Sequence, residues 1–72
     1  MEIAPDLAAR ALENALNAAP QFAQYEPFLV WRPLAQGGAL FLQYRIQPPS
    51  GLAGLWDFQN AVVKGYKSMA GV

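Results

Sequence analysis

Apolar residues recur at every third or fourth position in the first quarter of the chain, which is the spacing of an amphipathic helix. Pro5 and Asp6 form a favourable helix start, and Pro20 cannot continue a helix because its nitrogen carries no hydrogen. The pattern therefore predicts a helix over 6–19, whose alanine-rich stripe allows close packing against a neighbour. The stripe consists of Leu7, Ala8, Ala11, Leu12, Ala15 and Leu16.

The middle of the chain is typical of a β-hairpin. A connector over 21–27 has turn character at Glu26-Pro27. Strands are predicted over 28–34 and 39–46, because Gly37-Gly38 between them tolerates the positive φ angles of a tight hairpin turn.

The register of this hairpin follows from side-chain parity. We expect a loop of even length, either Gly37-Gly38 alone, which places Trp31 opposite Tyr44, or the four residues 35–38. Both choices give the same two faces, whereas a slip of one residue would mix them. One face carries Leu29, Trp31, Leu40, Leu42, Tyr44 and Ile46, with Pro33 and Ala35; the other carries Arg32, Gln43, Arg45 and Gln47, with Phe28, Val30 and Phe41.

A second helix is predicted after Pro48-Pro49, which ends the second strand. Ser50 can cap it, and the helix then begins at Leu52 or Leu55 and extends to Met69. Its apolar stripe consists of Leu55, Phe58, Val62, Tyr66 and Met69. The expected fold is α+β, a small single domain over 1–72 in the order α-β-β-α, with a two-stranded antiparallel hairpin packed with two helices.

The composition suggests that this domain needs a partner. The chain has 72 residues and no cysteine, so no disulfide staples a domain of a size that usually requires a staple or oligomerisation. Apolar residues make up 54% and charged residues only 14%, against about 25% in ordinary soluble domains. We therefore expect apolar surface that binds another copy or a larger complex.

Self-contained chemistry is not expected. Histidine and cysteine are absent, the five carboxylates form no motif, and Gly37-Gly38 lacks the lysine and helix start of a phosphate loop. The sequence therefore predicts no catalytic residue, no cofactor, no metal site and no small-molecule substrate.

The second hairpin face is the strongest candidate for a contact surface, because a two-stranded ribbon is marginal in water. In one interpretation this face, or a strand edge, binds another copy or another protein, and Pro33 suggests that the first strand lies at an edge. In the other, one helix covers each face and the chain is a closed monomer. We favour the first, with a protein interface formed by Phe28, Val30, Arg32, Phe41, Gln43 and Arg45.

Charges are divided unevenly along the chain. Residues 1–26 hold four carboxylates and Arg10, a net charge of −3, while residues 27–72 hold four cations and Asp57, a net charge of +3. A basic surface facing an acidic partner, or head-to-tail stacking of copies, would use this asymmetry. With so few charges, however, neutralisation within the fold explains the division as well, and we favour it.

Three neighbouring pairs, Trp31-Arg32, Tyr44-Arg45 and Tyr66-Lys67, have the residue types that hold single-stranded nucleic acid. The net charge is zero, and parity places Trp31 and Tyr44 on the buried face. We therefore interpret these aromatic residues as core and do not expect a nucleic-acid partner.

No apolar run reaches the about 20 residues of a membrane-spanning helix, and the first six residues lack the features of a signal peptide. We expect a cytoplasmic protein, or part of a cytoplasmically assembled particle, without a transmembrane segment. The predicted function is that of a small non-enzymatic interaction subunit that self-associates or docks into a larger assembly. The alternatives are a regulator or inhibitor that blocks a host enzyme or nucleic-acid machine and, third, a weak nucleic-acid binder.

Overall fold

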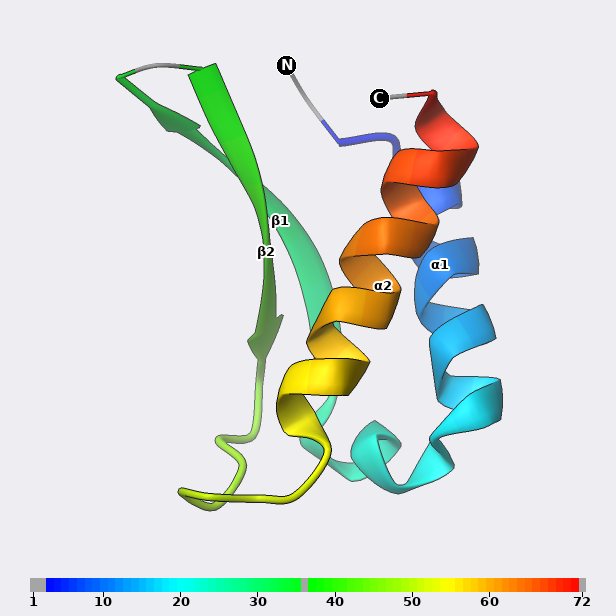
Figure 1. Ribbon diagram of the computed structural model, residues 1–72, viewed down its shortest axis with the longest axis vertical. Coiled ribbons are helices and arrows are strands. Elements are labelled where there is room, and N and C mark those ends of the chain that lie inside the picture. Colours follow the sequence, from blue (N-terminus) through cyan, green and yellow to red (C-terminus); the bar gives the residue numbers. More distant parts are fainter. Residues whose placement is uncertain (1–2, 36, 72) are drawn as a thin grey trace.

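The chain folds in the predicted order α-β-β-α, with one short helix added in the connector. The computed structural model describes residues 3–35 and 37–71, so Gln36 of the predicted turn lies outside the described residues. The elements are α1 (Pro5–Ala18), the 3₁₀ helix η1 (Pro20–Tyr25), β1 (Pro27–Leu34), β2 (Gly37–Tyr44) and α2 (Leu55–Ala70) (Figure 1).

Helix α1 begins and ends at the residues that its prolines dictate. Pro5 occupies the first turn, where a missing N–H costs nothing, and Asp6 beside it suits the positive end of the helix dipole. The Ala19 N–H donates to the Ala15 carbonyl at 3.0 Å, and Pro20 then stops the helix. The buried residues of α1 are Ala8, Ala11 and Ala15, so the predicted stripe is confirmed.

Helix α2 begins later than Ser50 would have placed it. Its N-cap is Gly54, which has a φ of 79° that a glycine adopts without steric penalty, and no side chain caps this end. The helix therefore starts at Leu55, the later of the two predicted starts, and extends to Ala70. Its buried residues are Phe58, Val62 and Tyr66, as the predicted stripe requires.

The two helices pack against each other through small residues. Gly65 of α2 faces Ala11 of α1 so closely that a Cβ added at Gly65 would lie 3.9 Å from the Ala11 Cβ. Such small side chains permit a short distance between helix axes. At the opposite end from the chain termini, the ring of Phe22 in η1 stacks on Phe58 with centroids 4.7 Å apart. Helices α1, α2 and η1 thus form one layer, and their buried apolar residues belong to the same core.

The hairpin register differs from the expected one by a shift of the turn. Leu34 pairs with Gly37 and Trp31 pairs with Leu40, so the prediction that Trp31 lies opposite Tyr44 is wrong. Gly37 and Gly38 both belong to β2, so neither of the two expected loops is found. Gly38 is needed inside β2, because the Trp31 ring occupies the space where a side chain at this position would be. Since the register is shifted by an even number of positions, the paired residues keep their predicted faces.

Strand β2 ends at Tyr44, two residues before the predicted end, but the next two residues are still hydrogen-bonded to the segment before β1. The Arg45 N–H donates to the Glu26 carbonyl and the Ile46 N–H to the Tyr25 carbonyl, both at 3.2 Å. Ile46, predicted on the buried face, lies beyond the ladder and is 48% exposed. These bonds join the base of the hairpin to η1.

Both helices lie on the same side of the hairpin (Figure 1). Leu29 and Leu42 are paired across the strands, and both are buried in the same core as the helix stripes. We call the face of the hairpin that carries Leu29 and Leu42 and is covered by the helices the inner face. The alternative with one helix on each face is therefore not the arrangement found.

Val62 tests whether the helix layer and the inner face share one core, since it has no exposed surface. Val62→Ala should lower the free energy of unfolding by about 2 kcal/mol, because buried methyl groups are lost and a cavity remains. Urea denaturation measures this, and Val63→Ala, at a half-buried position, is the matched control and should cost less than about half as much. Equal losses would contradict the described packing.

Candidate interaction surface

Six side chains that the sequence singled out lie together on the side of the hairpin away from the helices. We call this the outer face, consisting of Phe28, Val30, Arg32, Phe41, Gln43 and Arg45. Val30 pairs with Phe41, and Phe28 pairs with Gln43, so the apolar members form one contiguous group. Arg32 lies toward the loop end of the hairpin, opposite Ala39, and Arg45 lies just beyond the base of β2.

The apolar group of the outer face is partly open to solvent. Phe41 is 37% exposed, and Phe28 and Val30 are half-buried. The Arg45 guanidinium lies over the Phe28 ring, 4.8 Å from its centroid, in cation–π geometry. The outer face therefore offers an aromatic and aliphatic centre with an arginine toward each end.

The two strands also leave unpaired edges, since the sheet has two strands. Pro27 and Pro33 remove two N–H donors from β1. Strand β2 contains no proline, so all of its residues can donate. Its free edge is consequently the more complete template for adding a strand from another chain.

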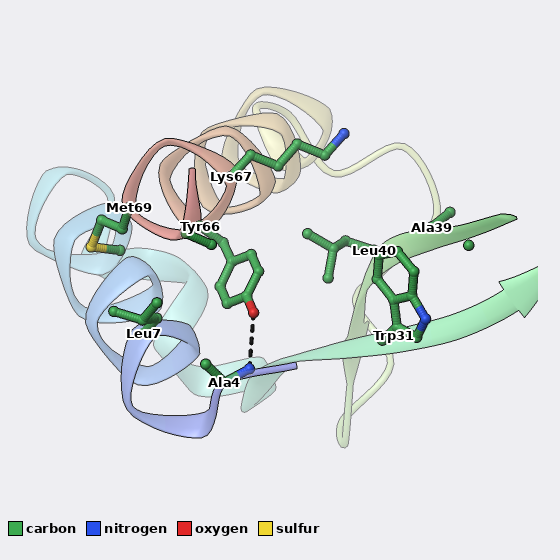
Figure 2. A pocket seen from close by; sticks show the side chains of 10 residues that line it. Ala4, Leu7, Trp31, Ala39, Leu40, Tyr66, Lys67 and Met69 are labelled. Atoms are coloured by element: carbon green, nitrogen blue, oxygen red, sulfur yellow. Dashed lines mark hydrogen bonds between the residues drawn. The ribbon is translucent and has the colours of Figure 1, made fainter. Parts of the chain in front are cut away.

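On the inner side, the hairpin diverges from the helices toward its loop end and leaves an open cavity of about 720 Å³ (Figure 1). Side chains from α1, β1, β2 and α2 surround it (Figure 2). The lining residues are Ala4, Leu7, Trp31, Gly38, Ala39, Leu40, Tyr66, Lys67, Met69 and Ala70. Trp31, predicted as core, is in fact a half-buried wall of this cavity.

Two tyrosines of the interior differ in how their hydroxyls are satisfied. The Tyr66 hydroxyl accepts a hydrogen bond of 2.9 Å from the Ala4 N–H, which ties the start of α1 to α2 (Figure 2). The Tyr44 hydroxyl is buried and has no hydrogen-bond partner among the described residues. Burial raises the pKa of Tyr44 above its ordinary value of 10.0, because the charged phenolate would be poorly solvated.

The neighbouring pairs of aromatic and cationic residues differ in whether their two members share a surface. Along a strand, successive side chains point to opposite faces, so Trp31 lies on the inner face and Arg32 on the outer face. Tyr66 is buried while Lys67 is exposed. Tyr66 and Lys67 nevertheless both line the inner cavity together with Trp31. The expectation that nucleic acid is not a partner stays a prediction.

The interpretation that the acidic and basic parts of the chain neutralise each other within the fold stays a prediction. No charged residue within 3–35 and 37–71 is buried.

Among residues 3–35 and 37–71, no group of three or more histidine, cysteine, aspartate or glutamate side chains is placed to hold a metal ion. In the same part of the chain, no helix has the length and apolar character needed to cross a membrane.

Comparison with protein-family models, with curated proteins and with solved structures gave no match. The outer face and the inner cavity are thus interpreted from their own geometry.

Two features of the surface were missed by sequence reasoning. The cavity was missed because strand parity assigns residues to a face but does not say how closely the helices approach that face. Trp56, in the first turn of α2, is 69% exposed although it is among the most apolar side chains. The sequence could have predicted this exposure, because Trp56 lies outside the apolar stripe of Phe58, Val62 and Tyr66.

The contact between Trp31 and Gly38 can be tested with two glycine variants. In Gly38→Ala the new methyl group would overlap the Trp31 ring, so the ring should move toward the cavity and change its fluorescence and near-UV circular dichroism. Gly37→Ala is the control: nothing lies near its added Cβ, but its φ of 120° disfavours alanine. It should lower stability by about 1 kcal/mol or more and leave the Trp31 signal unchanged. The reverse result would contradict the register.

The tyrosines yield a second test. Tyr44→Phe removes an unpartnered buried hydroxyl, so the free energy of unfolding at neutral pH should stay the same or rise by up to about 1 kcal/mol. Because the pKa of Tyr44 is higher in the folded chain than in the unfolded chain, ionisation of this tyrosine favours unfolding. The free energy of unfolding is therefore unaffected by this ionisation below pH 10 and falls as the pH rises above 10. Urea denaturation at several pH values should therefore show a smaller alkaline loss for Tyr44→Phe than for the unmodified chain.

Tyr66→Phe is the control for this test, because it deletes the bond to the Ala4 N–H and should cost about 1 kcal/mol at neutral pH. If both variants were equally destabilised, the Tyr44 hydroxyl would have to have a partner.

Proposed function

We propose that the chain is a non-enzymatic protein-interaction domain that docks on a protein, either another copy or a subunit of a larger assembly, through the outer face of its hairpin. The observation that supports this proposal is the placement of both helices on the inner face, which leaves Phe28, Val30 and Phe41 without a covering element among the described residues. A two-stranded ribbon with one open apolar face gains stability when a partner covers that face.

The chemistry of the outer face fits a docking surface. Interface hot spots are enriched in aromatic residues and arginine, and they work best when surrounding groups exclude water from them. Phe41 is the most accessible aromatic ring of the face, and Arg45 already contacts Phe28. Arg32 and Arg45 would then set the orientation of the partner, while Phe41 and Val30 supply the apolar contact.

The free edge of β2 gives a second element of the same docking mode. A partner strand added there would extend the sheet and continue the apolar group of the outer face. The non-enzymatic part of the proposal rests on the composition, because the chain has no histidine or cysteine to act as base or nucleophile.

Phe41→Asp tests the proposal, because a charge at the centre of the apolar group should abolish assembly and leave a folded monomer. Size-exclusion chromatography with light scattering measures assembly, and far-UV circular dichroism verifies the fold. Trp56→Asp is the matched control, since it places the same charge at an exposed aromatic position on α2 and should leave assembly unchanged.

Photo-crosslinking extends the test to partners other than the chain itself. A photoreactive residue in place of Phe28 should capture one defined partner in extracts of the native host, and the same residue in place of Trp56 should not. The proposal is wrong if the unmodified chain is monomeric at high micromolar concentration and no specific crosslink forms.

A further inference from the structure

The cavity on the inner side of the hairpin is separate from the outer face, and its lining points to a ligand of its own. We propose that it binds a small amphipathic carboxylate, such as a medium-chain fatty acid, with the hydrocarbon chain inside the cavity and the carboxylate on Lys67.

The size and walls of the cavity fit such a hydrocarbon chain. Its volume of about 720 Å³ lies in the range of small-molecule sites, which are mostly apolar with a few polar groups. Trp31 and Leu40 form the wall on the hairpin side, and Tyr66 lies on the opposite wall (Figure 2). Leu7 and Met69 complete the helix side with flexible apolar side chains that can adapt to an unbranched chain.

The charge at the cavity selects an anion. Among residues 3–35 and 37–71, Lys67 is the charged residue that lines it, and no aspartate or glutamate of this part of the chain does. Figure 2 shows the Lys67 side chain extended from α2 toward the hairpin, so that its ammonium group lies at the rim and not among the apolar residues. A carboxylate placed there would keep contact with water while its apolar tail leaves water.

The other polar side chains of the lining are Tyr66 and Trp31, and both can act as donors. The Tyr66 hydroxyl accepts the Ala4 N–H and keeps its own O–H to donate, and the indole nitrogen of Trp31 can only donate. The polar side chains of the lining therefore favour an acceptor as headgroup, and Lys67 adds the positive charge that suits a carboxylate.

Trp31 makes binding measurable. In the Trp56→Phe background, which changes an exposed side chain, Trp31 is the one tryptophan left of the two in the sequence. Decanoate, titrated below its micelle concentration, should produce a saturable shift of Trp31 fluorescence, and calorimetry should report the same Kd. Each methylene moved from water into the cavity is worth about fourfold in affinity, so octanoate should bind about 15-fold more weakly than decanoate.

Two lysine variants test the headgroup contact. Lys67→Gln should weaken decanoate binding about two- to fivefold, the value of an exposed ion pair, and should leave binding of the neutral analogue decanol unchanged. Lys64→Gln is the matched control, since it is exposed on the same helix but does not line the cavity, and it should have no effect. Thermal unfolding by circular dichroism should be the same for both variants.

Each other result overturns the inference. No saturable signal by fluorescence or calorimetry, or equal affinity for octanoate and decanoate, would show that the cavity does not hold a hydrocarbon chain. Equal loss in Lys64→Gln and Lys67→Gln, or equal loss for decanol and decanoate, would show that Lys67 does not bind the carboxylate. The assembly experiment on Phe41 is independent of all these outcomes.

Discussion

The contact between α1 and α2 is the interaction on which the rest of the structure depends. Alanines on α1 and Gly65 on α2 allow the two helices to approach closely, so they bury their stripes partly against each other. The remaining apolar surface of this pair then covers the inner face of the hairpin, where Leu29 and Leu42 complete the core. If large side chains replaced Ala8, Ala11 and Ala15, the helices would be forced apart and this single layer could not form.

One helical layer covers one face of a sheet, and the outer face of this hairpin follows from that constraint. Phe28, Val30 and Phe41 are apolar, yet no described helix covers them. In a chain of 72 residues without disulfides, such apolar surface costs stability unless something binds it. The physical basis of the proposed docking function is therefore this apolar face, which the single layer of helices leaves uncovered.

The cavity has a different origin, in the way the hairpin is attached. At its base the hairpin is joined to η1 by the bonds from Arg45 and Ile46, next to the stack of Phe22 on Phe58. Toward the loop end the strands diverge from the helices, and the space between them is bounded by Trp31, Tyr66 and Lys67. Interaction surface and cavity thus lie on opposite faces of one hairpin, and a change at one need not disturb the other.

The sequence by itself determined the two long helices, the two strands, their order and the faces of the paired strand residues, because these follow from local periodicity, prolines and strand parity. It determined the members of the outer face for the same reason. Only the tertiary structure decided the turn position, since Gly38 is needed beneath the Trp31 ring and not in the loop. It also decided that both helices share one face, and that Trp31 lines a cavity with Lys67, because the distance between packed elements depends on contacts between residues far apart in the chain.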